Sequence, residues 1–195
     1  MFGKFKGIAI IGVIGFIAYG ALFGAKSEPQ ADLGAILDRT EYALNTYQTH
    51  LSSNEVAEVT DANMEEFSGF LTQVLNTDPP VYSKPLGMNV QSDATFLGFA
   101  DANEDGIQDA GEGKVFTVEI DEANGRLIAT DIAGNSSGLR FSGSGILTGM
   151  LLGNMIGRQR GAGVSAASFN NRTVTPRSSY RSPTRARTGG PRSGK

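Results

Sequence analysis

The residues with a spacing that suits chemistry lie in one acidic stretch, residues 101–112. Side chains that carry oxygen occupy positions 1, 3, 5, 9 and 12 of this stretch, and glycine occupies position 6. Calcium takes six to eight oxygen ligands, and a 12-residue loop supplies them from these positions, from the carbonyl at position 7 and from a bidentate carboxylate at position 12. The spacing therefore predicts a calcium site. Its ligands would be Asp101, Asn103, Asp105, the carbonyl of Ile107, Asp109 and Glu112.

The alternative interpretation of this stretch is an ordinary acidic turn. Such a turn would have to tolerate repulsion between four carboxylates within 12 residues when no cation is bound, namely those of Asp101, Asp105, Asp109 and Glu112. Magnesium is disfavoured because it demands strict octahedral geometry and keeps several of its waters. Extracellular calcium modules work at about 10⁻⁴–10⁻³ M, so we expect a structural ion more than a sensor.

The order of residues in the loop, D-x-N-x-D-G-x-Q-D-x-x-E, resembles known calcium loops. It is similar to those of dockerins, of thrombospondin type 3 repeats and, most closely, of the B-type repeats of bacterial surface adhesins, where the loop also follows a strand. The likeness covers residues 99–114 and implies calcium with the ligands named above, but neither a family fold nor an activity. Gln108 departs from the aliphatic residue of a standard EF-hand.

The composition of the 195-residue chain excludes several other chemistries. There is no cysteine, which excludes disulfides, thiolate metal sites and cysteine nucleophiles. His50 is the single histidine, so a zinc or iron centre with several imidazoles cannot form within one chain. We interpret His50 as a solvated side chain at a helix end, where it favours the helix dipole.

Charge is strongly segregated along the chain. All 20 acidic residues lie between Glu28 and Asp131, a stretch with four basic residues, whereas ten basic residues and no acidic ones follow Asp131. Asymmetry of this kind indicates regions with different partners or compartments.

An uncharged apolar run at residues 7–25 follows Lys4 and Lys6. About 20 such residues cross a bilayer, so we predict a retained membrane anchor over residues 1–26, with a cleaved signal peptide ending near Ala18-Tyr19-Gly20 as the alternative. The flanking lysines should stay in the cytoplasm, which places the following residues outside it.

Residues 27–140 are expected to form the exported acidic domain. Apolar side chains at helical spacing predict a helix over 33–51 and a second one that opens at Asp61 and ends before Asp78-Pro79-Pro80. Alternation then predicts strands over 95–100, 115–120 and 126–130, with a hairpin turn at Asn124-Gly125. The expected core residues are Leu33, Ile36, Phe67, Phe70, Phe116, Val118, Ile120, Leu127 and Ile128.

Glycines recur every four residues in the segment 141–161. Gly145, Gly149, Gly153 and Gly157 would line one helix face, an arrangement that lets helices approach closely in membranes. Three interpretations stay open: a short second span that pairs with the first helix, an interfacial or re-entrant helix, and a soluble partner-binding helix or linker. Arg158 and Arg160 follow at once, as a cytoplasmic stop would require.

Serine, threonine, glycine, proline and arginine dominate residues 162–195, so we predict a disordered tail. Its arginines suit anionic lipid headgroups; nucleic acid is the weaker expectation, because Phe169 and Tyr180 are too sparse to stack bases. The cations expected at an anionic surface are Arg158, Arg160, Arg172, Arg177, Arg181, Arg185, Arg187 and Arg192.

These predictions combine into an α+β protein. We expect an N-terminal transmembrane helix, two amphipathic helices on a small antiparallel meander with a calcium loop, a glycine-zipper helix and a disordered basic tail. The expected function is a non-enzymatic, calcium-binding scaffold of the cell envelope, which associates with itself or another membrane protein through glycine-rich helices. The alternatives are a tether whose basic tail binds nucleic acid or anionic lipid, or an exported calcium-dependent hydrolase that uses Asp61, Glu65 and Glu66. These carboxylates equally suit a helix N-terminus.

Overall fold

The computed structural model describes residues 30–141 and 149–183. The predicted anchor, Gly145 and the arginines Arg185, Arg187 and Arg192 lie outside the described residues. Within those two described stretches, no helix is both long and apolar enough to cross a membrane.

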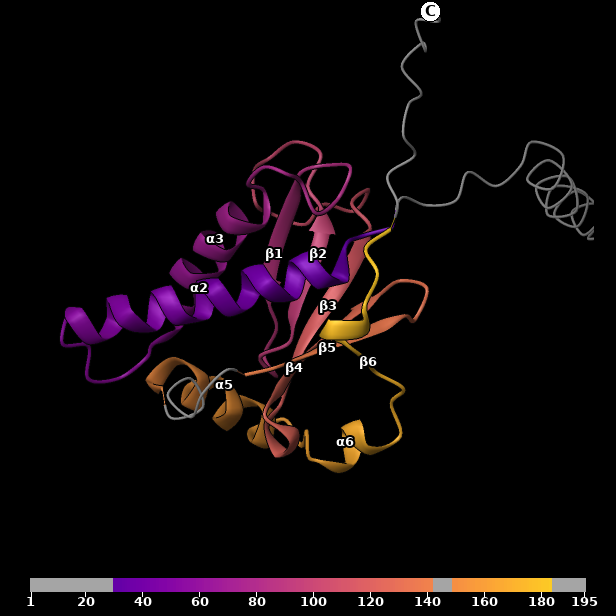
Figure 1. The fold of residues 1–195 in the computed structure, drawn as a ribbon. Helices are drawn as coiled ribbons and strands as arrows, with labels where there is room; N and C mark the ends of the chain where they lie inside the picture. The colour runs from indigo at the N-terminus through magenta and orange to yellow at the C-terminus, as the bar shows by residue number, and fades with distance from the viewer. Residues whose placement is uncertain (1–29, 142–148, 184–195) are drawn as a thin grey trace, which may run out of the picture.

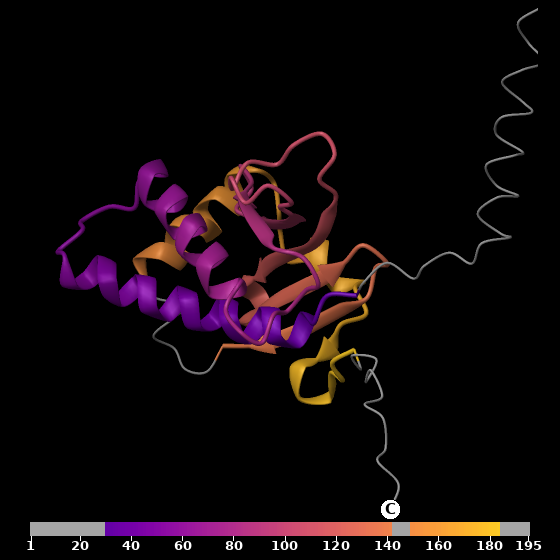
Figure 2. The same cartoon turned by 90° about the horizontal axis from the view of Figure 1, so that it is seen from above.

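Two helices precede the sheet, as the sequence predicts. Helix α2 spans Leu33–Ser53 and α3 spans Asp61–Leu75. The Asp32 side chain accepts a hydrogen bond from the Ala35 amide at the start of α2, and Thr60 caps α3, so both helix starts have partners for their free amides. The apolar stripe of each helix is buried, and the two helices lie together on one face of the sheet (Figure 1 and Figure 2).

The sheet has six strands in sequence order. All neighbours are antiparallel except the last pair, β5 and β6, which is parallel. The strands are β1 Leu86–Val90, β2 Phe96–Ala100, β3 Lys114–Asp121, β4 Arg126–Asp131, β5 Ser136–Arg140 and β6 Thr175–Pro176. The three predicted strands correspond to β2, β3 and β4, whereas the other three were not predicted.

The turn between β3 and β4 forms where Asn124-Gly125 predicts it. A short 3₁₀ turn covers Glu122–Asn124, and Gly125 follows in the left-handed region at φ 58°. The buried carboxylate of Asp121 holds this turn because it accepts hydrogen bonds from Asn124 and from Arg126 at 2.7 Å. The left-handed conformation suits glycine, which has no Cβ.

One core lies between the helices and the sheet. Phe67 of α3 meets Phe96 of β2 edge-on, with ring centroids 5.7 Å apart. Most predicted core residues belong to this cluster, but Phe70 is only partly buried at its edge. Ile128 is buried outside the cluster. It points to the other sheet face because alternate residues of β4 face opposite sides.

Helix α5, Met150–Gly161, corrects the prediction for the glycine segment. Its apolar side chains join the main core, and its Leu151 amide donates to Gln48 of α2 at 2.8 Å. The helix is therefore part of the α+β domain, which agrees with the helix of the third interpretation but replaces an outside partner by the chain's own core. The residues between the glycines form a buried stripe, namely Leu151, Leu152, Met155 and Ile156.

Residues 162–183, which we call the C-terminal strap, correct the predicted disorder. The strap contains the short helix α6, Ala167–Asn170, then β6 and the 3₁₀ turn Arg177–Ser179. Phe169 is buried, and Val174 packs so closely on β5 that a Cβ at Gly138 would lie 2.6 Å from its Cγ1. The composition predicts disorder because few apolar residues occur here, yet Phe169 is buried and Val174 packs on β5.

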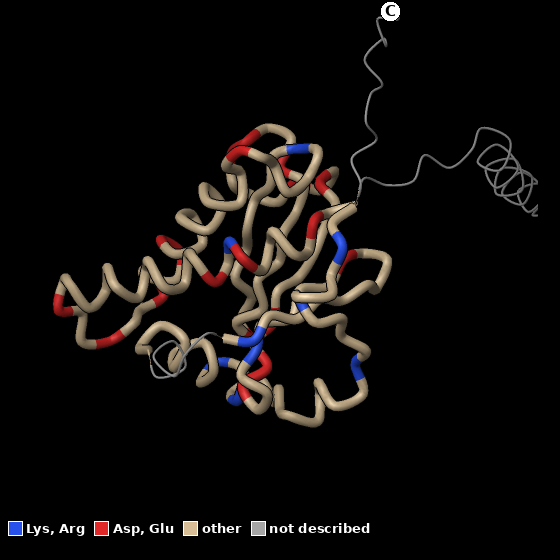
Figure 3. Tube along the Cα trace, in the orientation of Figure 1, with Lys and Arg blue, Asp and Glu red and all other residues tan. Residues whose placement is uncertain are grey.

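Arginines of the strap and of α5 pair with acidic residues elsewhere in the fold, and Figure 3 marks the positions of both kinds of residue along the backbone. Within the strap, Arg172 pairs with Glu119 and Arg177 with Asp38. Arg158 and Arg160 of α5 likewise pair with Asp61 and Glu122. The segregated charges therefore meet within one chain. Exposed ion pairs of this kind each contribute about 0 to 1 kcal/mol to the free energy of folding. The arginines therefore fix where the strap lies but add little to its stability.

We expect Phe169→Ala to loosen the strap. Loss of its buried ring should lower the free energy of unfolding by about 3 kcal/mol and make trypsin cut faster after Arg172. Urea unfolding and timed proteolysis measure the two effects. The control is Tyr42→Ala, because Tyr42 is 59% exposed on α2. Equal cleavage of the Phe169 variant and the unchanged protein would contradict an ordered strap.

Candidate calcium-binding loop

The predicted loop joins β2 to β3 at one end of the sheet. Its two ends are fixed by backbone hydrogen bonds, since the Ala100 amide donates to Gly113 and the Asp101 amide donates to Pro85, both at 3.0 Å. The register between β2 and β3 shifts at Gly98 and Phe99, immediately before the loop. The sheet therefore holds both anchors of the loop.

Asp101 is the buried carboxylate of the loop, at 3% exposure. Its Oδ2 accepts a hydrogen bond from the Gly106 amide at 2.9 Å, across the turn. Its Oδ1 is buried and has no hydrogen-bond partner within the part of the chain that is described. Gly106 has φ 76°, the conformation that the predicted sharp turn at position 6 requires.

Asn103 lies between two further carboxylates. Its Nδ2 donates to Asp105 Oδ2 at 2.9 Å and to Asp109 Oδ2 at 3.1 Å. Its Oδ1 accepts from the Asp105 amide at 3.3 Å, and the Ile107 amide donates to Asp105 Oδ1 at 2.8 Å. The side-chain NH₂ group of Asn103, at position 3, thus links the predicted ligands at positions 5 and 9.

Glu112 folds back over the loop. Its Oε1 accepts from the Ala102 amide at 2.7 Å and its Oε2 from the Asp109 amide at 3.1 Å. Position 12 is thereby tied to the amides at positions 2 and 9. The Ile107 side chain is 66% exposed.

Gln108, which departs from the EF-hand pattern, also has a role in the loop. Its Nε2 donates to the Glu112 carbonyl at 3.2 Å. The sequence offered no signal for this bond, because a glutamine at position 8 was only recognisable as a mismatch.

The predicted ligand side chains lie close together in the loop, but most of their oxygens accept hydrogen bonds from amide groups of the loop. Among residues 30–141 and 149–183, no three carboxylate or histidine side chains are gathered into a group that could hold a metal ion. The donor set nevertheless fits calcium in kind: it consists of hard oxygens around a glycine turn, and one buried oxygen of Asp101 lacks a partner.

A groove of about 810 Å³ lies beside the loop. Ser68 and Thr72 of α3 and its C-cap residue Asn76 line the groove, together with Asp101 and Asp105 of the loop. The Asn76 side chain also donates to the Leu86 carbonyl and accepts from the Leu86 amide, so the C-cap of α3 is bonded to the start of β1.

The other acidic residues singled out by sequence lie on α3, beside the groove at the loop. Asp61 pairs with Arg158, and Glu66 accepts a hydrogen bond from Tyr47 at 2.7 Å. Burial and this hydrogen bond raise the pKa of Tyr47 to about 12. Glu65 is exposed along the groove, and His50 is exposed in the last turn of α2, as expected for a solvated terminal residue.

The predicted helix-packing glycines lie on the outer face of α5. Gly153 and Gly157 are exposed, and a Cβ at either would meet no atom within 4 Å. Gly149 precedes the helix as its N-cap. Close packing of another helix against this face stays a prediction from the sequence.

No protein-family model, no curated protein and no solved structure matches this chain.

Proposed function

We propose that this protein is a calcium-binding structural domain of the cell envelope, held at the membrane by residues 7–25. In this proposal the ion fixes the loop between β2 and β3, and the domain serves as a scaffold rather than as an enzyme. The membrane assignment is supported by the length of the apolar run and by Lys4 and Lys6 before it.

The single observation that carries the calcium proposal is the state of Asp101. A carboxylate buried to 3% exposure, with one oxygen free of hydrogen bonds, is costly unless a positive charge compensates it. Within the described residues no arginine, lysine or histidine forms an ion pair with Asp101. A calcium ion would supply this charge.

The residues that would hold the ion are those of the sequence prediction. Asp101, Asp105, Asp109 and Glu112 provide carboxylates, and Ile107 provides its carbonyl. Asn103 would have to turn its amide by 180°, so that Oδ1 replaces Nδ2 between Asp105 and Asp109. When bound, calcium supplies charge compensation and cross-links the two ends of the loop.

Calorimetric titration of the full chain in detergent tests this proposal. We expect saturable binding of one calcium ion with a Kd of about 10⁻⁴ to 10⁻³ M, because extracellular modules with such loops work in this range. Magnesium serves as the matched control, and we expect it to bind more weakly because it needs strict octahedral geometry. The absence of saturable heat up to about 10 mM calcium would contradict the proposal, since this exceeds the expected Kd at least tenfold.

A further inference from the structure

Strand β1 is the edge of the sheet next to α3, and its outer side lines a groove. The Asp101 amide donates to the Pro85 carbonyl at 3.0 Å, so the odd-numbered residues on this side of the sheet bond β2. In an antiparallel ladder only alternate residues bond the neighbouring strand. The even-numbered residues of β1 therefore direct their main-chain groups into the groove, namely Leu86, Met88 and Val90.

Side chains of α3 and its C-cap bond only part of this edge. Asn76 bonds both main-chain groups of Leu86, and the Ser68 hydroxyl donates to the Met88 carbonyl at 2.9 Å. Among the described residues, none bonds the Met88 amide or the amide and carbonyl of Val90. This part of the edge is therefore open to an extended peptide, which adds to a sheet through main-chain hydrogen bonds.

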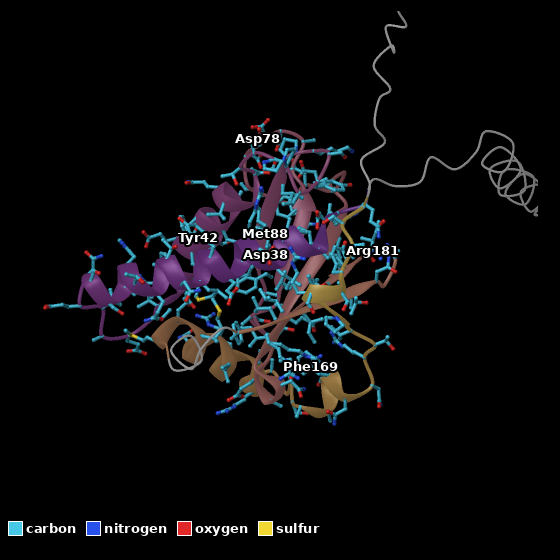
Figure 4. The ribbon with its side chains drawn as sticks, viewed as in Figure 1. Asp38, Tyr42, Asp78, Met88, Phe169 and Arg181 are labelled. Atoms are coloured by element: carbon cyan, nitrogen blue, oxygen red, sulfur yellow. The ribbon has the colours of Figure 1, made fainter. Side chains whose placement is uncertain are left out.

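The groove follows the whole length of α3. The hollow of about 810 Å³ beside the loop and a second one of about 530 Å³ share Glu65, Met88 and Gly106 in their linings, and Figure 4 labels Met88. We call the two hollows together the β1 groove. Its lining extends from Asp61 to Asn76, which is about 22 Å at 1.5 Å per residue of helix. An extended peptide rises about 3.3 Å per residue, so about six residues fit.

The β1 groove is acidic. Glu65 and Glu104 are exposed in its lining, and neither forms an ion pair with a described residue. Asp101 and Asp105 of the loop add two further carboxylates, whereas the described lining holds one cation without an ion pair, Lys84. This charge favours a partner with positive side chains.

Asp101 is the buried anionic group of the β1 groove. It lines the groove at 3% exposure, and its Oδ1 has no hydrogen-bond partner within the described chain. An ammonium or guanidinium group of a bound peptide would compensate this charge, as calcium does in the proposed function. Asp101 and Asp105 belong both to the groove and to the predicted ligand set, so the two kinds of cation compete for them.

We propose that the β1 groove binds an extended segment of a partner protein with lysine or arginine at alternate positions, and that calcium in the loop competes with this segment. Alternate positions of an extended chain face the same side, so these cations reach the carboxylates of the groove together. The competition rests on the proposed function, because it takes Asp101 and Asp105 as calcium ligands. The binding of the segment does not.

Fluorescence anisotropy of a labelled hexapeptide, Lys-Val-Lys-Val-Lys-Val, tests the binding to the full chain in neutral detergent with chelator. We expect saturable binding of one peptide in about 0.15 M salt, where charges more than about 8 Å apart are screened. Changing both Glu65 and Glu104 to glutamine should weaken it by about 5 to 20-fold, because each exposed ion pair accounts for up to about fivefold. Neither residue is a predicted calcium ligand.

The matched control changes Glu55 and Glu58 to glutamine. Both are exposed and lie outside the lining of the β1 groove, so the net charge changes equally while the groove stays intact. We expect the peptide affinity of this variant to change by less than about twofold, since charges remote from a bound partner are screened.

Calcium provides the second measurement. At about 10 mM it should weaken peptide binding by up to about 10 to 100-fold, the ratio for full competition at a Kd of about 10⁻⁴ to 10⁻³ M. Magnesium at the same concentration should have a smaller effect. Asp109 is a predicted ligand that does not line the groove, so Asp109→Asn should keep the peptide affinity in chelator and lose most of the effect of calcium.

Three results would overturn the binding proposal. The first is an equal loss of affinity in the two double variants, because binding would then follow net charge. The second is undiminished binding of the fully N-methylated peptide, which cannot donate main-chain hydrogen bonds. The third is a several-fold gain in affinity when Arg185, Arg187 and Arg192 are changed to serine, because the chain's own tail would then be the occupant.

The calcium results separate this inference from the proposed function. Peptide affinity that stays unchanged while calorimetry shows calcium bound to the loop would overturn the competition. Binding of the peptide to the groove in a protein that binds no calcium would contradict the proposed function, and the competition with it, but would support the partner site.

Discussion

Changing both Asp101 and Asp105 to asparagine should abolish the stabilisation of the protein by calcium. At about 10 mM calcium, a site with a Kd of about 10⁻⁴ to 10⁻³ M stabilises the folded state by about 1.4 to 2.7 kcal/mol, which corresponds to a rise of about 3 to 10 °C in the melting temperature. Mutation of a residue that only hydrogen-bonds a metal ligand already lowers metal affinity by about 10 to 100-fold. Loss of two carboxylates that bind the ion directly should therefore lower calcium affinity by at least about 100-fold. Thermal melting with calcium and with chelator measures the difference.

Glu104→Gln is the matched control for this pair of changes. Glu104 lies in the same loop and carries the same charge, but it occupies position 4 and is not a predicted ligand. We expect it to keep most of the rise in melting temperature. A similar loss in both proteins would mean that calcium responds to the general negative charge of the loop, which contradicts a defined site.

Gly98→Val should be the most destabilising change near the loop. Gly98 on β2 stands opposite Phe116 on β3, and a Cβ at position 98 would lie 2.3 Å from the Phe116 ring. That ring is fully buried, so the core behind it would have to shift. We expect the free energy of unfolding to fall by about 3 kcal/mol, the upper part of the usual range for overpacking. Urea unfolding measures it.

Gly69→Ala provides the matched control for Gly98→Val. A Cβ at Gly69 meets no atom within 4 Å, and the residue lies inside α3. Alanine should therefore raise stability by up to about 1 kcal/mol through helix propensity. If valine at position 98 were tolerated as well as alanine at position 69, the pairing of β2 with β3 that anchors the loop would be incorrect.

The spacing of apolar residues predicts those helices and strands in which buried and exposed residues alternate regularly along the sequence. Both helices and the middle strands have regular apolar spacing, and Asn124-Gly125 marks the turn between β3 and β4. Strand β1, with Gly87 and Asn89 between its apolar residues, lacks a strong signal, and β5 consists of Ser-Ser-Gly-Leu-Arg. These strands depend on pairing with β2 and β4 across the sheet, which a local pattern does not contain.

The order of the strap could not be predicted from its composition, because the strap is held by contacts with residues far away in the sequence. Phe169 and Tyr180 are too sparse in the sequence to indicate a fold, yet Phe169 is buried and the Tyr180 hydroxyl accepts a hydrogen bond from the Leu33 amide. The charge segregation indicates regions with different partners or compartments, whereas in the fold Arg172 and Arg177 pair with Glu119 and Asp38 of the same chain. In the loop, the sequence predicted the glycine turn at Gly106, but not the burial of Asp101 or the bond from Gln108 to Glu112.

A crystal structure of the full chain grown in calcium tests the central claim most directly. The account predicts one ion, identified by its anomalous signal, with oxygens of Asp101, Asp105 and Glu112 at about 2.3 to 2.6 Å. It also predicts that the Asn103 amide has turned its oxygen toward the ion. A loop that keeps the Asn103 bonds to Asp105 and Asp109 at saturating calcium, or an ion bound only elsewhere on the acidic surface, would contradict the account.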